Sequence, residues 1–230
     1  MSTVSGKRLG RLALGLGAVV ATAVALAPSA GAETPEAPAN QAPHGLVLTH
    51  PLSDNSHLRV EESAAPAFAG GAPERTLSFT EQVQQKNQWC WAATGVSIEQ
   101  FHGARTSQAQ FCAAGKGTSA GNCPNQPGTM SEILRGFHGT GFSASSTGGA
   151  VSFDTITQQI DDGAPMLVGI YWTQGGGHAE VIYGYDSANK SLNVADPWPT
   201  YQRYRTQSYN SFLRNQQFTW GDTVVDIAKG

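Results

Sequence analysis

The apolar patterning needed for a hydrophobic core is confined to the later part of this 230-residue chain. Residues 33–75 are rich in Ala, Pro, Glu and Ser, contain Phe68 as their single aromatic residue, and show no sustained period of 2 or 3.6. Such segments bury too little apolar surface to offset the entropy of ordering the chain, so we interpret 33–75 as a low-complexity linker or a pro-segment removed on maturation. The remaining 76–230, about 155 residues, can form one domain with its own core.

The N-terminus has the three parts of a secretory signal peptide. Lys7, Arg8 and Arg11 form a basic region, and an apolar run over 12–27 follows. An Ala-Gly-Ala tripeptide ending at Ala32 then supplies the small residues of a cleavage site. The alternative, an uncleaved anchor, needs about 20 apolar residues. We expect residues 1–32 to be a signal peptide and the mature protein to be secreted and free of the membrane. The Ala/Gly-rich style of the segment suggests a bacterial source.

Charge and residue spacing argue against several partners. The formal net charge is -3, and no stretch is basic enough to form the stripe that nucleic-acid binding uses. No group of Cys and His residues has the spacing of a zinc site. We therefore expect that the protein binds no nucleic acid, no metal and no cofactor. We also expect it to be a monomer.

The three cysteines, Cys90, Cys112 and Cys123, cannot all pair within one chain. In an oxidising compartment cysteines tend to form disulfides, and an odd one is either intermolecular or a free thiol with a chemical role. Cys112 and Cys123 flank a polar loop containing Gly, Ser and Thr, which predicts a disulfide that stabilises the fold by about 3 kcal/mol on the chain-entropy model.

Cys90 stands in the sequence Gln-Trp-Cys-Trp-Ala-Ala, at the start of a helix-like stretch over 90–101 that Gly103 ends. A helix N-terminus favours the thiolate, which is the nucleophilic form of cysteine. A buried structural cysteine fits the two flanking tryptophans equally well. Cys90 alone leaves both interpretations open.

His178 has the setting of a general base. It follows Gln-Gly-Gly-Gly and opens an apolar strand over 179–185. The glycines leave room for a ligand or a second chain segment, and a histidine beside open space is well placed to take a proton. The alternative is a strand-end histidine that caps a turn. Glu180, two positions on, either lies beside His178 on the same face of the strand or faces solvent, and we expect it to face solvent.

Asp196 follows the next strand, 191–195, and a hairpin loop over 186–190 joins the two strands. The hairpin places Asp196 at the same end as His178, where its carboxylate can accept the Nδ1–H bond and hold the tautomer. Trp198 is expected to shield this bond from water. The alternative is that the Asp-Pro pair at 196–197 forms only a turn.

These motifs, taken in order, resemble the papain-like cysteine peptidases. The similarity is greater to the small bacterial branch around the AvrRpt2-type effectors, which has a Cys-Trp-Ala-Ala motif, and to the bacteriocin-leader peptidases. It covers about residues 79–200 and rests on Gln84, Cys90-Trp91, His178 and Asp196-Pro197-Trp198. The 88 residues from Cys90 to His178 are fewer than the roughly 130–150 of papain, which suggests a trimmed fold.

The resemblance implies a role for each matched residue. Cys90 attacks the scissile carbonyl, His178 is the base that later protonates the leaving amine, and Asp196 orients His178. Gln84 and the Cys90 backbone N–H form the oxyanion hole. Trp91 and Trp198 are supporting residues. Together these assignments predict a secreted endopeptidase that hydrolyses peptide or protein substrates through a thioester.

Three other functions fit the same residues: acyl transfer, cell-wall amide hydrolysis, and binding by an inactive papain-like domain. The amidases usually have a different cysteine context. An inactive domain has little need to keep Gln84, Cys90, His178 and Asp196 together.

The order of predicted elements indicates an α+β fold. Helices are expected over 90–101, 107–113, 130–137 and 153–161, and strands over 166–172, 179–185, 191–195 and about 216–227. We expect a papain-like two-lobe fold, with a helical N-terminal half and the Cys90 helix packed on an antiparallel sheet.

Overall fold

The structure, a computed structural model, describes residues 74–230. The predicted signal peptide and nearly all of the 33–75 segment lie outside the described residues. The first element, β1 (Glu74–Thr76), begins two residues before the boundary that the composition predicted.

The first lobe is helical, as predicted. It consists of α1 (Cys90–Phe101), α2 (Gln108–Lys116) and α3 (Met130–Gly139), with a short 3₁₀ turn at Ala120–Asn122. Capping boxes start two of these helices, Ser107 with Gln110 at α2 and Thr129 with Glu132 at α3. The helix that follows Ser107 extends three residues further than predicted, because α2 continues until Gly117 takes the left-handed conformation.

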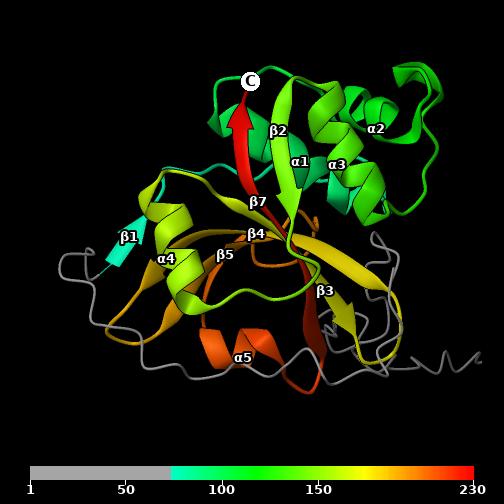
Figure 1. Ribbon diagram of the computed structural model, residues 1–230. Helices are drawn as coiled ribbons and strands as arrows, with labels where there is room; N and C mark the ends of the chain where they lie inside the picture. The colour runs from blue at the N-terminus through cyan, green and yellow to red at the C-terminus, as the bar shows by residue number, and fades with distance from the viewer. Residues whose placement is uncertain (1–73) are drawn as a thin grey trace, which may run out of the picture. The chain divides into compact units, whose positions relative to one another are not determined.

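The second lobe is a twisted antiparallel sheet with two further helices (Figure 1). Its strands pair in the order β2-β7-β3-β4-β5-β6, and β1 pairs with the far end of β4. The elements are β2 (Phe142–Ser146), α4 (Phe153–Asp161), β3 (Met166–Trp172), β4 (Gly177–Asp186), β5 (Ser191–Ala195), β6 (Tyr204–Ser208), α5 (Tyr209–Leu213) and β7 (Phe218–Lys229). The α+β class is therefore confirmed, with a helical first half and an antiparallel sheet in the second.

The elements that the sequence did not predict are β1, β2, β6 and α5. The strands β2 and β6 form the two edges of the sheet, and most of their side chains are polar and at least partly exposed. Such strands lack the apolar alternation that identifies a half-buried strand. The helix α5 has five residues, too few to show a helical period.

Two hydrophobic cores lie on opposite sides of the sheet, and the first of them joins the two lobes. The first lies between α1–α3 and the sheet and contains Cys90, Trp91, Ala179 and Val181. The second lies under α4 and α5 and contains Ile170 among its members. Neighbouring residues of a strand point to opposite faces, so β3 and β4 contribute side chains to both cores.

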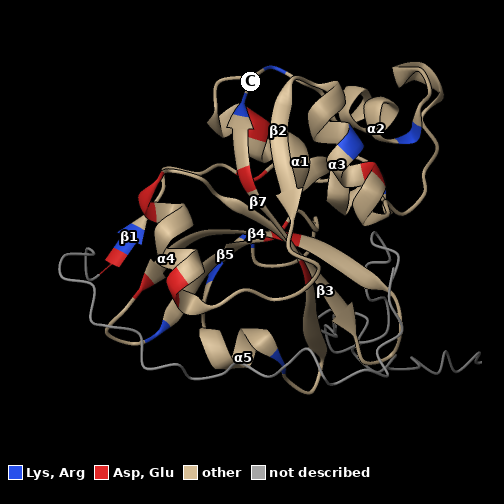
Figure 2. Ribbon diagram, in the orientation of Figure 1, with Lys and Arg blue, Asp and Glu red and all other residues tan. Residues whose placement is uncertain are grey.

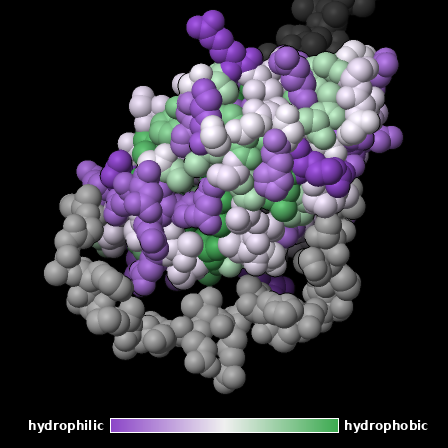
Figure 3. Space-filling view, turned by 45° about the horizontal axis from the view of Figure 1, so that its top comes forward, coloured by the Kyte–Doolittle hydropathy of each residue, from purple (hydrophilic) through white to green (hydrophobic). Residues whose placement is uncertain are grey.

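Charged residues are scattered over the described ribbon, with Lys and Arg interspersed among Asp and Glu (Figure 2). On the face shown in Figure 3, apolar residues form small islands among polar ones. No helix within residues 74–230 is long and apolar enough to cross a membrane.

Candidate active site

Cys90 is the first residue of α1 and is fully buried. Trp89 is the N-cap residue of α1, and its side chain makes no capping hydrogen bond. The positive end of the helix dipole, at Cys90, is therefore not offset by a capping oxygen. The sulfur atoms of Cys112 and Cys123 lie at bonding distance, with Cα atoms 6.1 Å apart, so Cys90 is the free cysteine among residues 74–230.

His178 and Asp196 meet as the hairpin predicted. His178 is fully buried near the start of β4, and its Nε2 lies 2.8 Å from Oδ1 of Asp196, which follows β5. The backbone N–H of Trp198 donates to the same oxygen at 2.8 Å. The predicted ring nitrogen is wrong: Nε2, not Nδ1, faces the carboxylate. Nδ1 is buried and has no hydrogen-bond partner within residues 74–230.

The charges of this pair shift both pKa values. Burial lowers the pKa of His178, but the charge and hydrogen bond of Asp196 raise it more, and the Cys90 thiol acts in the same direction; the resulting pKa lies well above 6.5. Burial raises the pKa of Asp196, while His178, the Trp198 N–H and Arg205 lower it below its usual value. The site therefore favours an imidazolium next to a carboxylate.

Two tryptophans enclose the His178 ring. Trp172, at the end of β3, stacks on it with ring centroids 6.3 Å apart and planes at 22°. Trp198 meets it edge-on at 6.4 Å, which places an aromatic ring beside the His178–Asp196 bond as expected. The contribution of Trp172 was not predicted, because strand alternation alone does not show which end of β3 lies beside His178.

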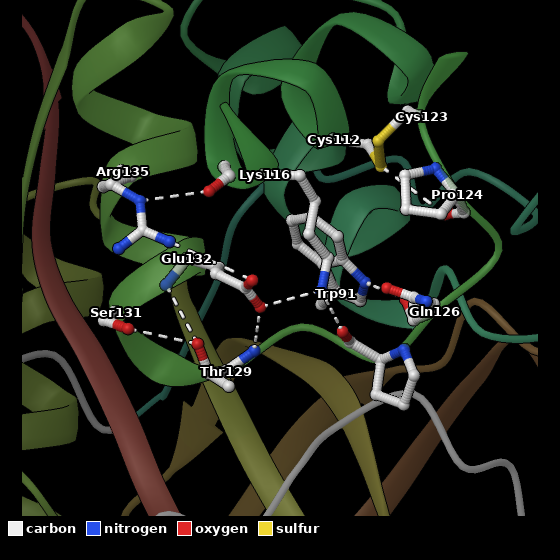
Figure 4. A network of polar contacts seen from close by, with 12 residues as sticks. Trp91, Cys112, Lys116, Cys123, Pro124, Gln126, Thr129, Ser131, Glu132 and Arg135 are labelled. Carbon is white, nitrogen blue, oxygen red and sulfur yellow. Dashed lines mark hydrogen bonds and ion pairs between the residues drawn. A yellow bond between two sulfur atoms is a disulfide. The ribbon is translucent and has the colours of Figure 1, made fainter. Parts of the chain in front are cut away.

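Trp91, the other predicted supporting residue, packs inside the helical lobe. It is fully buried, its Nε1 donates to the Gln126 carbonyl at 3.2 Å, and the Lys116 Nζ lies 5.7 Å from its ring (Figure 4). These contacts support the helix that carries Cys90.

The prediction that Glu180 faces solvent is wrong. Glu180 shares the face of β4 that carries His178, and it is 1% exposed. Its Oε2 accepts a hydrogen bond from the Nη2 of Arg205 on β6 at 2.6 Å, and Arg205 also lies 3.9 Å from Asp196 Oδ2. Strand alternation gives the face of a residue, but the covering Arg205 comes from a strand that the sequence did not predict.

His178, Glu180 and Asp196 carry donor atoms within 4.8 Å of one another, a spacing compatible with a metal ion. However, Arg205 lies 2.6 Å from Glu180 Oε2 and 3.9 Å from Asp196 Oδ2, so its positive charge offsets part of the negative charge that would attract a cation. Burial raises the pKa of Glu180 to about 7, with Asp196 adding to the rise and Arg205 opposing it. The cluster therefore has the character of an ion-pair network.

Gln84 lies beside this network and is 4% exposed. Its backbone N–H donates to the Pro197 carbonyl at 2.9 Å, which ties the Gln84 loop to the turn after Asp196. Its side-chain Nε2 donates to the Lys86 carbonyl at 2.9 Å. The structure therefore brings Gln84 to the Asp196 side of the site.

Glu81 is a further buried carboxyl, which the sequence analysis did not select. Its Oε1 accepts a hydrogen bond from Ser97 of α1 at 3.3 Å. Burial, with a further contribution from Asp196, raises the pKa of Glu81 well above its usual value. Through its bond to Ser97, this side chain joins the Gln84 loop to α1. Its position in a short polar segment gave no periodic signal of burial.

A pocket of about 470 Å³ adjoins Asp196. Its aromatic lining is Trp172, Tyr201 and Phe218, and its charged lining is Glu180, Asp196 and Arg205. Because Trp172 also stacks on His178, the pocket lies on the histidine side of the site.

A cysteine at the start of the leading helix, together with a His–Asp pair on an antiparallel sheet, is the arrangement of papain-like cysteine peptidases. The family model of the papain-like cysteine protease AvrRpt2 matches residues 73–217, and the chain belongs to this family. It is therefore a papain-like cysteine peptidase, as the motifs predicted.

A solved structure shows the same fold, and a second has a lower similarity. The peptidase domain of Streptococcus ComA is similar with a TM-score of 0.52 and 21% identity, over 66% of this chain and 99% of that chain. Xylellain, a cysteine protease from Xylella fastidiosa, has a TM-score of 0.49 and 13% identity, over 70% of this chain and 88% of that chain. No curated protein matches the sequence.

Proposed function

We propose that this protein is a secreted endopeptidase that cleaves peptide bonds with Cys90 as nucleophile, His178 as base and Asp196 as the residue that orients His178. The observation that carries this proposal is the buried His178–Asp196 pair at 2.8 Å, with the second ring nitrogen of His178 left without a partner within residues 74–230. That nitrogen, Nδ1, is the atom that takes the Cys90 proton.

The reaction then proceeds in two halves. The Cys90 proton moves to His178 Nδ1, and the sulfur attacks the carbonyl carbon of the scissile bond. The carbon–nitrogen bond breaks as His178 returns the proton to the leaving amine, which gives a thioester. Water, deprotonated by Nδ1, attacks the thioester and releases the carboxylic acid and the Cys90 thiol.

The oxyanion of the first half is stabilised by the backbone N–H of Cys90 and by Gln84. An amide nitrogen carries two hydrogens, and one of those on Gln84 is used by the Lys86 carbonyl. The second donates to the oxyanion. The raised pKa of His178 and the lowered pKa of Asp196 support the imidazolium that each half of the reaction requires.

The surroundings of the site suit a peptide chain. The large hydrophobic side chains exposed within 74–230 are Val83, Tyr201 and Tyr204. Val83 precedes Gln84, and the Tyr201 ring lies 6.2 Å from that of Trp198. Since His178 protonates the leaving amine, the pocket beside Trp172 and Asp196 receives the part of the substrate that follows the scissile bond.

The test is cleavage of an unfolded protein substrate by the secreted protein and by Cys90→Ala. We expect no cleavage by the variant and an unchanged circular dichroism spectrum. His178→Ala is expected to be equally inactive, while the control His138→Ala, which alters a histidine of α3, keeps full activity. Turnover by the Cys90 variant would exclude this mechanism.

Covalent labelling tests the thiols directly. An epoxide inhibitor of papain-like enzymes, applied without reductant, is expected to modify Cys90 and to leave Cys112 and Cys123 unlabelled and linked. An unreactive Cys90 in a folded protein would support the inactive binding domain. Transfer of the acyl group to an added amine, in place of hydrolysis, would support the acyl transferase.

A further inference from the structure

The segment that leads into α1 is held by a second segment 35 or more residues away in the sequence. We call the second segment, Cys123–Pro127, the strap. Three side chains of the leading segment donate to backbone carbonyls of the strap: Lys86 Nζ to Cys123 at 3.0 Å, Trp89 Nε1 to Pro124 at 2.8 Å and Trp91 Nε1 to Gln126 at 3.2 Å. The Asn125 side chain makes two more bonds: its Nδ2 donates to Asn87 Oδ1 at 2.6 Å, and its Oδ1 accepts from the Gln88 backbone N–H at 3.1 Å.

The strap is fixed at both of its ends. Cys123, at one end, lies at disulfide distance from Cys112 of α2. At the other end, the Lys116 Nζ donates to the Pro127 carbonyl at 2.6 Å and to Glu132 at 2.9 Å, which connects the strap to the start of α3 (Figure 4). Both lysines also lie over indole rings, Lys86 at 4.0 Å from that of Trp89.

These contacts converge on the first residues of α1. Trp89 is the N-cap, and its carbonyl accepts hydrogen bonds from the N–H groups of Ala92 and Ala93. Because no side chain caps this end of α1, the Trp89 indole and its bond to the strap fix where the helix begins. Cys90 is the next residue, so both its sulfur and its backbone N–H depend on that position.

We infer that the strap is a positioning element for catalysis and that the Cys112–Cys123 disulfide keeps it in place, so that full activity requires one disulfide and one free thiol in the same lobe. This inference rests on the proposed peptidase function. A misplacement of reacting groups by about 1 Å can reduce the rate by 10²-fold, so a loosened strap affects the reaction even in a folded protein. Lys86, Trp89 and Asn125 are then positioning residues.

The first test is the double variant Cys112→Ser with Cys123→Ser, assayed at a temperature where circular dichroism shows it to be folded. We expect kcat to fall by about 10-fold or more and KM to change little, since the position of the nucleophile and not the substrate surface is altered.

Excess dithiothreitol is expected to lower the wild-type kcat to the same level. The dithiol donates two electrons to the disulfide, releases both thiols and becomes a cyclic disulfide. The double variant is not expected to respond.

The second test keeps the disulfide and removes one strap contact. Asn125→Ala loses the bonds to Gln88 and Asn87 and is expected to lower kcat several-fold. The matched control is Asn189→Ala, which removes an exposed Asn–Asp hydrogen bond in the β4–β5 hairpin and is expected to keep full activity. Equal kcat for wild type, Asn125→Ala and the folded double cysteine variant would overturn the positioning role.

Alkylation of Cys90 by iodoacetamide at neutral pH separates this inference from the proposed function because it needs no substrate. Alkylation faster than that of a simple thiol is expected in the wild type, because His178 acts as the base of Cys90, and slower alkylation is expected in the double variant. Equally fast alkylation in both proteins would overturn the inference. Alkylation at the rate of an unactivated thiol in both would instead overturn the proposed function.

Discussion

The helical lobe and the sheet lobe hold their halves of the candidate site by different means. Around Cys90, side chains bond mainly to backbone carbonyls, and bulky rings fill the space between α1 and α3. Around His178, the polar contacts are between charged groups: the buried Asp196 pairs with His178, and the partly exposed Arg205 bonds to the buried Glu180 and lies 3.9 Å from Asp196. The nucleophile is therefore positioned mainly by packing and by hydrogen bonds to backbone carbonyls, whereas the base is positioned by an ion-pair network. Changes in the sheet lobe are expected to alter the chemistry most, and changes in the helical lobe to alter stability and alignment.

Removing the carboxylate of Asp196 is expected to have the largest effect. Asp196→Ala leaves His178 without its orienting partner and Arg205 with one carboxylate fewer, and we expect kcat to fall by about 10⁴-fold, as for orienting carboxylates of other triads. Steady-state kinetics and the pH profile of kcat/KM measure this loss of activity. A loss below about 10-fold would show that packing by Trp172 and Trp198 orients the ring, and the contrast between the lobes would disappear.

Gln84→Ala tests the junction between the two lobes. The variant loses one oxyanion donor, and we expect kcat to fall by about 100- to 1000-fold. Binding of substrate is expected to change much less, since the donor acts on charge that develops in the transition state. The neighbouring Gln85→Ala is the control, because Gln85 bonds to Gln108 Oε1 through its backbone N–H, which the substitution retains. Equal losses in both variants would assign the effect to the loop and not to Gln84.

Gly128→Ala tests packing in the helical lobe alone. A Cβ at Gly128 would lie 2.5 Å from the Trp91 ring, whereas one at Gly121, in the same lobe, meets nothing within 4 Å. We expect Gly128→Ala to lower the free energy of unfolding by about 1–3 kcal/mol and Gly121→Ala to change it little. Chemical denaturation measures both. Equal stability of the two variants would show that Trp91 shifts at no cost and that this lobe is not tightly packed.

The smallest expected effect is on the pH dependence of stability. The pKa of Glu180 is about 7 in the folded protein, above the ordinary glutamate value of 4.5 that applies to the unfolded chain, so the folded state binds more protons between these values. Stability from this group is therefore highest below pH 4.5 and decreases as the pH rises toward 7. We expect Glu180→Gln to flatten that part of the melting-temperature profile. Glu74→Gln, which removes an exposed carboxylate, controls for net charge. An unchanged slope in the Glu180 variant would assign the pH dependence to other carboxyls such as Glu81.

Much of the fold could be predicted because it is encoded locally. The helices α1 and α4 and the strand β5 have the predicted bounds. The meeting of His178 and Asp196 also follows from local rules, since a short hairpin places the ends of its two strands together.

Contacts between distant segments decided the rest. The burial of Glu180 depends on Arg205, which lies two strands away, and the orientation of the His178 ring depends on the groups on both of its sides. The strap contacts residues 86–91, from which it is separated by 35 or more positions in the sequence. Periodicity and turn chemistry are properties of neighbouring residues, so the sequence determined the strongly patterned elements, the cysteine helix and the order of the candidate triad. Which charges are buried, and what holds the nucleophile in place, depend on the packing of whole elements, and only the tertiary structure decided them.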